Sequence, residues 1–172
     1  MNKKIKISIV MLLGCLAITC CGKKETAPTD ESTEINKTIT DEGHPAAVSN
    51  VLVITGNDEM QFSTNELRAQ AGKPITLTLK HTGKIPKQAM GHNVVILKEG
   101  INEAGFAVKA AAAQETDYIP DSEKASIIAH TKLLGGGEQD TIEFTIDKKG
   151  TYNFLCSFPG HYAMMKGVLI VE

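Results

Sequence analysis

Three residues near the C-terminus are spaced so that one loop can carry a thiol, an imidazole and a thioether. Cys156 is followed by His161 five residues later, and Met165 comes four residues after that. A soft thiolate, a borderline imidazole and a weak thioether suit copper. Zinc would ask for a fourth strong ligand, and calcium or magnesium would ask for oxygen ligands. The loop therefore predicts a copper site.

A second imidazole is available upstream, in the segment Met90–Asn93, where His92 follows a glycine. Two imidazoles and one thiolate in a trigonal plane, with a distant methionine on the axis, match the known description of blue-copper electron-transfer sites. The alternative to a copper site is that Cys156 is a buried free cysteine whose neighbours have no role in metal binding. Because the ligands would come from two distant segments, we expect copper binding to raise the stability of the fold.

Several segments of the chain are similar, in order and spacing, to those of the azurins, a bacterial group within the cupredoxin family. The resemblance covers roughly residues 50–172 and is carried by Gly56–Phe62, His81–Lys87, Met90–Asn93, Ile128–Leu133 and Cys156–Gly167. It implies a blue copper protein that carries single electrons, with one copper ion per chain.

The resemblance also implies a role for each ligand. His92, Cys156 and His161 would be the equatorial ligands, Met165 the axial one, and the carbonyl of Gly91 a weak fifth contact. The family's redox partners, such as c-type cytochromes or reductases, would dock transiently.

Two departures from the family pattern bear on stability and leave the ligand set intact. Azurins usually carry a disulfide near the start of the domain, and the corresponding positions here are Asn50 and Gly72. A tryptophan often follows the first ligand loop, whereas Val94 follows Asn93 here and the chain contains no tryptophan.

The residues beside the ligands suggest how the site is supported. The amide of Asn93 can fix the two ligand loops to each other, and backbone N–H groups near Ser157 and Phe158 can donate to the sulfur and raise the reduction potential. His81 is interpreted as a structural neighbour of the copper, and His130 as a solvated surface residue. An apolar rim around the solvent edge of His161 is expected from Met60, Met90, Phe158, Pro159 and Met164. Such a small patch suits brief encounters with a redox partner.

Short alternating stretches predict the fold class. Ile75, Leu77 and Leu79 alternate with polar residues, and runs such as 141–146 and 152–156 repeat that pattern between turn residues. We therefore expect an all-β Greek-key sandwich or barrel. The alanine-rich stretch Glu103–Gln114 should form one short external helix, with Phe106 and Ala110 facing the sandwich.

The N-terminal part of the chain predicts export and an anchor. Residues 1–21 combine lysines with a short apolar run and read as a signal peptide of the lipoprotein type. Cys20 is the favoured lipidation site, with Cys21 and Cys15 as alternatives, and an ordinary secreted protein remains a second interpretation. Residues 22–46, which include a solvated His44, are expected to form a disordered linker, and residues 47–172 the folded domain.

Composition and charge narrow the function. A chain of 172 residues that is 42% hydrophobic suits one domain with appendages, and a net charge of −2 argues against a nucleic-acid partner. The leading hypothesis is a non-catalytic electron carrier in the periplasm or cell envelope. A copper-storage or delivery protein and the copper domain of an enzyme are the rivals. Catalysis would need a second metal or an open coordination position, and no further histidine cluster supports it.

Overall fold

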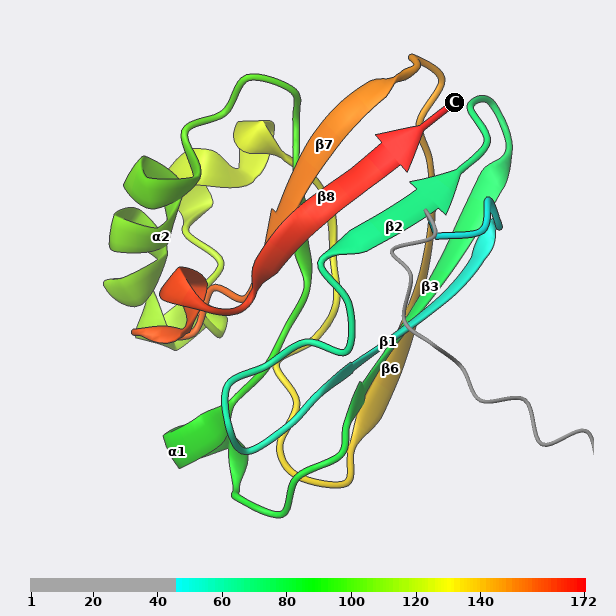
Figure 1. The fold of residues 1–172 in the computed structure, drawn as a ribbon. Helices are drawn as coiled ribbons and strands as arrows, with labels where there is room; N and C mark the ends of the chain where they lie inside the picture. The colour runs from blue at the N-terminus through cyan, green and yellow to red at the C-terminus, as the bar shows by residue number, and fades with distance from the viewer. Residues whose placement is uncertain (1–45) are drawn as a thin grey trace, which may run out of the picture. The chain divides into compact units, whose positions relative to one another are not determined.

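Two β-sheets packed face to face make up the part of the chain that the structure, a computed structural model, describes, which is residues 46–172 (Figure 1). The predicted signal segment with Cys15, Cys20 and Cys21 lies outside the described residues, as does the predicted linker up to residue 45. Within residues 46–172, no helix combines the length and the apolar composition that a membrane crossing requires.

The first sheet has the strand order β1-β3-β6. Strand β1 (Val51–Gly56) runs parallel to β3 (Pro74–His81), and β6 (Gln139–Thr145) pairs antiparallel with β3. The second sheet has the order β2-β8-β7-β4-β5. Its strands are β2 (Glu66–Ala69), β8 (Lys166–Val171), β7 (Gly150–Leu155), β4 (Val95–Leu97) and β5 (Ile127–His130).

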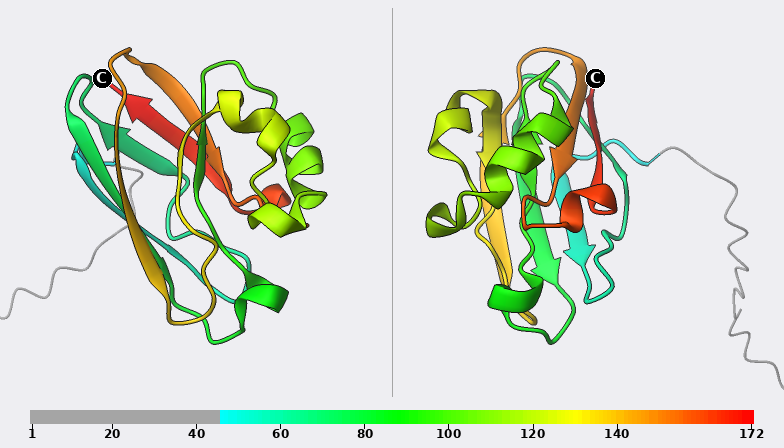
Figure 2. Two further views of the ribbon diagram at one scale, coloured as in Figure 1. Left: turned by 180° about the vertical axis from the view of Figure 1, so that it is seen from behind. Right: turned by 90° about the vertical axis from the view of Figure 1, so that its left-hand side faces the viewer.

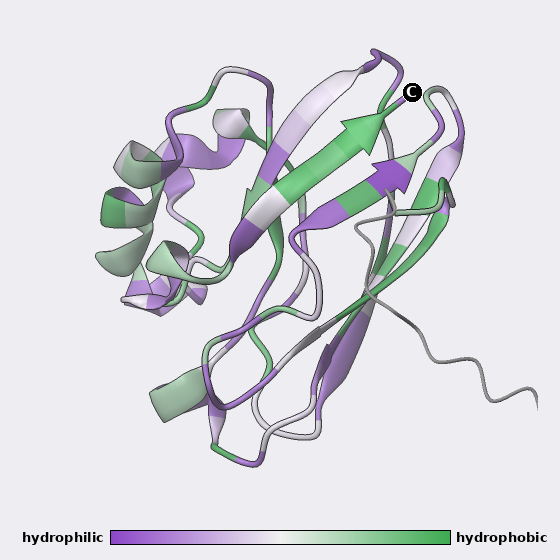
Figure 3. Cartoon of the chain, viewed as in Figure 1, coloured by the Kyte–Doolittle hydropathy of each residue, from purple (hydrophilic) through white to green (hydrophobic). Residues whose placement is uncertain are grey.

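The core lies between the sheets, where alternate residues of the facing strands meet. Ile75, Leu77 and Leu79 of β3 are fully buried, as the alternation predicts, and they pack with Ile54 of β1 and Phe154 of β7. Strand β8 is hydrophobic along most of its length (Figure 3). The predicted all-β sandwich is confirmed.

The helices lie outside the sheets (Figures 1 and 2). A short turn of helix, α1 (Lys87–Met90), follows β3, and α2 (Glu103–Ala111) follows β4. Short 3-10 helices occupy Gln114–Thr116, Asp121–Ser126 and His161–Ala163.

Helix α2 begins where the sequence predicts but ends early. The Asn102 side chain caps it by accepting a hydrogen bond from the N–H of Gly105 at 2.8 Å, and Phe106 and Ala110 are buried against the second sheet as expected. The prediction that the helix reaches Gln114 is wrong, because the N–H groups after Ala111 turn to carbonyls three residues back. The tighter turn leads into the buried Tyr118.

Side-chain hydrogen bonds join the segments that a disulfide would join in the azurin pattern. The amide of Asn50 donates to the carbonyls of Gln70 (3.2 Å) and Pro74 (3.3 Å), and its oxygen accepts from the N–H of Gln70 (3.1 Å). Asn50 thus links the start of β1 to the turn between β2 and β3.

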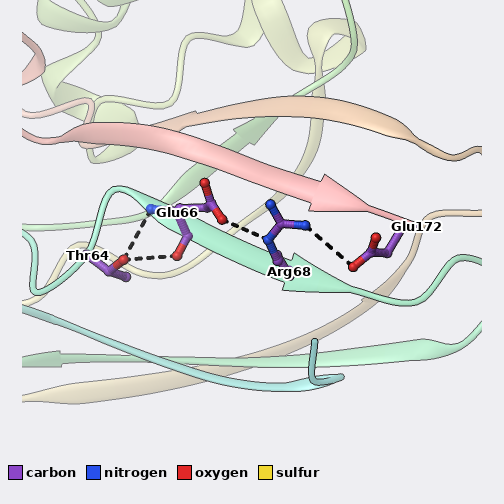
Figure 4. A network of polar contacts seen from close by, with 4 residues as sticks. All are labelled: Thr64, Glu66, Arg68 and Glu172. Carbon is purple, nitrogen blue, oxygen red and sulfur yellow. Dashed lines mark hydrogen bonds and ion pairs between the residues drawn. The ribbon is translucent and has the colours of Figure 1, made fainter. Parts of the chain in front are cut away.

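A second polar network ties β2 to the end of the chain (Figure 4). Arg68 Nε donates to Glu66 at 2.7 Å, while its Nη1 lies 3.6 Å from the carboxylate of Glu172. The hydroxyl of Thr64 caps the same strand by accepting from the N–H of Glu66. These contacts hold β2 beside β8 at the partly exposed edge of the second sheet.

We expect Asn50→Ala to lower the free energy of unfolding by about 1–2 kcal/mol, because a net hydrogen bond contributes roughly 0.5–1.5 kcal/mol and this site is partly exposed. Urea unfolding followed by circular dichroism measures the change. Lys73→Ala, an exposed substitution in the same turn, is the matched control. Equal midpoints for the two variants would show that Asn50 carries no such role.

Candidate metal centre

The structure brings together the three strong ligands that the sequence predicts. One ligand atom from each of His92, Cys156 and His161 can be chosen so that all lie within 4.8 Å of one another, and all three residues are buried. His92 lies between α1 and β4, whereas Cys156 follows β7 and His161 begins the turn before β8. The two segments meet because β4 and β7 are antiparallel neighbours, with Val95 opposite Leu155.

The sulfur of Cys156 faces the remaining donors. Its Sγ lies 3.7 Å from Nδ1 of His161 and 3.8 Å from the carbonyl oxygen of Gly91. The N–H of Cys156 donates to the carbonyl of Met165 at 2.9 Å, which closes the loop at the base of β8. The loop between β7 and β8 therefore holds thiol and imidazole side by side.

Asn93 connects the two ligand segments, as the sequence suggests. Its amide Nδ2 donates to Oγ of Ser157 at 2.8 Å, and its Oδ1 accepts from the N–H of Ser157 at 2.9 Å. The N–H of Ser157 itself therefore points to Asn93 and not to the sulfur. The N–H groups of Asn93 and Phe158 oppose the rise in the pKa of the Cys156 thiol, and donation to the sulfur from N–H groups near Ser157 and Phe158 stays a prediction.

The ring of His92 is oriented by a main-chain group that the sequence analysis did not identify. Its Nε2 donates to the carbonyl oxygen of Asn57 at 2.7 Å, so Nε2 carries the proton and Nδ1 has a free lone pair. That Nδ1 is buried and has no hydrogen-bond partner among the described residues. A buried polar atom without a partner is costly unless it binds something, so the histidine fits a metal ligand.

His81 lies against His92 as a structural neighbour. The two rings stack with centroids 4.2 Å apart and an interplanar angle of 19°. The N–H of Gly83 donates to Nδ1 of His81 at 3.1 Å, and Nε2 of His81 donates to the carbonyl of Met90 at 2.8 Å. With both nitrogens occupied, His81 is not available as a ligand. His130 is exposed, as the sequence suggests.

Met165 lies beside the same ligands and is fully buried. Gly56, at the end of β1, permits this approach: a Cβ at that position would lie 2.9 Å from Cδ2 of His92 and 3.3 Å from Cε of Met165. A larger residue would push the ring and the thioether away. The thioether therefore stands within the cluster that holds Cys156.

Burial sets the proton affinities of these groups. It raises the pKa of the Cys156 thiol to about 11, against the opposing effect of nearby backbone N–H groups. It lowers the pKa of His161 to about 4 and also depresses the pKa of His92. Without a metal, the site at neutral pH thus contains a protonated thiol and two neutral imidazoles.

The residues predicted to form the apolar rim differ in exposure. Met164 is 58% exposed and Pro159 is exposed, whereas Met60 and Met90 are half-buried. Phe158 is only 9% exposed, because its ring packs between His161 and Tyr118 at centroid distances of 4.6 and 5.0 Å. Phe158 thus supports His161 from inside more than it covers the surface.

The match to known proteins agrees with this geometry. The family model for copper binding proteins of the plastocyanin/azurin family matches residues 48–172. Azurin of Alcaligenes faecalis is 44% identical over 120 residues, covering 67% of this chain and 93% of that protein. Outer membrane protein H.8 of Neisseria gonorrhoeae is 46% identical over 118 residues, covering 66% of this chain and 63% of that protein.

A solved structure shares the fold. Dithionite-reduced auracyanin of Roseiflexus castenholzii is 36% identical and has a TM-score of 0.66, over 73% of this chain and 99% of that one. The β-sandwich and the buried His-Cys-His cluster together define a cupredoxin with one type 1 copper ion. Proteins of this class are blue copper electron-transfer proteins. The chain belongs to the plastocyanin/azurin family of copper-binding proteins.

We expect copper binding near pH 8 to release about one proton per ion, because the thiol must ionise while both imidazoles are already neutral. The number should fall as the pH rises through the thiol pKa of about 11. Calorimetric titration with Cu(II) in buffers of different ionisation enthalpy gives the proton count. Two or more protons at pH 8 would mean that a histidine is charged in the metal-free protein.

Proposed function

We propose that this chain carries single electrons between redox proteins of a bacterial cell envelope, and that it is a carrier and not an enzyme. His92, Cys156 and His161 would bind one copper ion in the equatorial plane, Met165 would be the axial ligand, and the carbonyl of Gly91 a weak fifth contact. The observation that carries the proposal is that the buried side chains of His92, Cys156 and His161 lie together, and that Nδ1 of His92 has no hydrogen-bond partner among the described residues.

Copper held by these residues would supply the one-electron chemistry, since it is stable as both Cu(I) and Cu(II). The chain's own residues hold the donors still and keep water out. Asn93 braces the two ligand segments, and the Asn57 carbonyl fixes the His92 ring. Phe158 and Tyr118 pack behind His161. Donors that cannot move favour similar geometry in both oxidation states, which lowers the energy of rearrangement on electron transfer.

Burial of the site supports a carrier over an enzyme. His92, Cys156 and His161 are each no more than 3% exposed, so a substrate molecule has no access to the donors. An electron needs only a short path through His161 to the surface. The exposed Met164 and Pro159, with half-buried Met60 and Met90, supply an apolar docking surface near that edge. A c-type cytochrome or a reductase that docks briefly on such a surface is the partner class we propose.

The cell envelope is proposed from two observations. The predicted signal segment ends at cysteines that can be acylated, with Cys20 favoured. The H.8 relatives are named outer membrane proteins. A lipid at Cys20 and a linker of about 25 residues would let the copper domain reach roughly 25–30 Å from the membrane. Mass spectrometry of the mature N-terminus would identify the modified residue.

The ligand assignment predicts distinct behaviour for two variants. Protein loaded with Cu(II) should show an intense absorption at roughly 600 nm that bleaches on reduction, with about one copper per chain. Cys156→Ser should abolish the band because the thiolate is lost. Met165→Leu should keep the band and shift the potential, because the axial contact is weak. A blue serine variant would refute the assignment.

If partners dock on this apolar surface, a charge placed in it should slow electron transfer from a partner without changing the copper spectrum. Met164→Asp should slow reduction by a c-type cytochrome about tenfold, because the apolar surface would have to desolvate a carboxylate. The spectrum should stay unchanged, since Met164 points to solvent. Val51→Asp, at another exposed apolar residue, is the matched control, because Val51 begins β1 whereas Gly56 at the other end of the strand lies next to His92. Stopped-flow kinetics at fixed ionic strength measures both. Equal rates would place the docking surface elsewhere.

A further inference from the structure

The oxygen that orients His92 belongs to an irregular loop, residues 57–61 between β1 and β2. The carbonyl of Asn57 accepts from Nε2 of His92 and also from the N–H of Met60 at 3.2 Å. Inside the loop, Oδ1 of Asn57 accepts from the N–H groups of Glu59 (3.2 Å) and Gln61 (3.0 Å). Met60 takes a left-handed conformation, with φ of 56°. A loop of this kind can orient a ring only if it is itself held in place.

Asp58 provides a contact that leaves the loop. Its carboxylate accepts from the N–H of Lys84 at 2.8 Å and from the N–H of Ile85 at 3.3 Å, in the segment between β3 and α1. These bonds lower the pKa of Asp58, so the group is ionised at neutral pH and the bonds are charge-assisted. One side chain thus joins two loops that lie far apart in the sequence.

The segment that Asp58 holds also positions the second neighbour of His92. Gly83 donates its N–H to Nδ1 of His81, and the ring of His81 stacks on His92. The Asn57 carbonyl at the Nε2 of His92 and the stacked ring at its face are therefore both connected to the same carboxylate.

Gly83 is required for the carboxylate to reach this position. A Cβ at residue 83 would lie 1.9 Å from Oδ1 and 2.3 Å from Cγ of Asp58, and the three heavy atoms nearest to it all belong to Asp58. Distances below 3.0 Å force a displacement. Asp58 and Gly83 therefore form one interlocking contact, and a side chain at residue 83 would displace the carboxylate.

We propose that Asp58 is a positioning residue for the metal site: its carboxylate, seated on Gly83, latches the 57–61 loop to the 83–85 segment and so makes His92 present Nδ1 to copper. Asp58 is not a ligand and acts through the Asn57 carbonyl and the His81 ring. The inference rests on the proposed role of His92 as a ligand.

The first test removes the latch. Asp58→Ala should weaken copper binding about tenfold, the lower end of the loss seen when groups that orient a metal ligand are removed. In the metal-free variant, ¹⁵N NMR of the His92 ring should show a mixture of tautomers in place of the single Nε2–H form. Asp58→Asn keeps one oxygen acceptor and the shape of the side chain, so its copper affinity should lie between those of wild type and Asp58→Ala. This variant separates loss of the carboxylate from a general folding defect.

Glu59→Ala is the matched control, because Glu59 has the same charge in the same loop and contributes only its main-chain N–H. It should keep wild-type affinity and one tautomer. A merely structural Asp58 would lower the melting temperature of the metal-free protein and leave both readouts unchanged. That result would overturn the proposal.

The second test uses the contact from its other side. Gly83→Ala should reproduce the loss of affinity, since its methyl group displaces the carboxylate. Asp58→Ala combined with Gly83→Ala should bind copper no more weakly than Asp58→Ala alone, because nothing is left to displace. Additive losses would refute the latch. His92→Gln separates the two proposals: if it retains tight copper binding, the ligand assignment fails, whereas unchanged affinity in Asp58→Ala alone refutes only the latch.

Discussion

The structure depends on keeping three metal-binding donors out of water while leaving them free to bind. Buried polar atoms must have partners. The fold supplies partners for the atoms that are not needed: Nε2 of His92 bonds Asn57, and both nitrogens of His81 are occupied. Nδ1 of His92 is left without one. Because the fold gives hydrogen-bond partners to the other ring nitrogens and leaves this one without, an apolar part of the β-sandwich keeps a donor free to bind a metal ion.

Rigidity follows from the way the two ligand segments are joined. β4 and β7 are adjacent strands, and each delivers its ligand segment where the pairing ends. Asn93 and Ser157 continue that connection through side-chain and main-chain hydrogen bonds beyond the last strand residues. The site is therefore an extension of the sheet. Two loops that moved independently would change the distances between donors each time an electron arrived.

Side-chain hydrogen bonds and ion pairs also join distant segments away from the metal site. Where azurins usually have a disulfide, Asn50 contributes three hydrogen bonds to the neighbouring turn. Arg68 forms ion pairs with the carboxylates of Glu66 and Glu172 along the β2 edge (Figure 4). These contacts are partly exposed and individually weak. The large apolar core between the sheets, which includes Ile75, Leu77 and Phe154, provides most of the stability.

Features that depend on residues close together in the sequence could be predicted from the sequence alone. Alternation predicted β3, and the spacing of Cys156, His161 and Met165 predicted a copper loop, because one short loop forces its donors together. His92 could be added only by matching the known ligand set of blue-copper sites, since no local spacing relates it to Cys156. The helix end at Ala111 and the partner of the Ser157 N–H were missed. The roles of the Asn57 carbonyl and the Asp58 carboxylate were decided by tertiary structure alone. A main-chain oxygen has no residue type, and a carboxylate that bonds main-chain N–H groups 26 and 27 residues away leaves no pattern in the sequence.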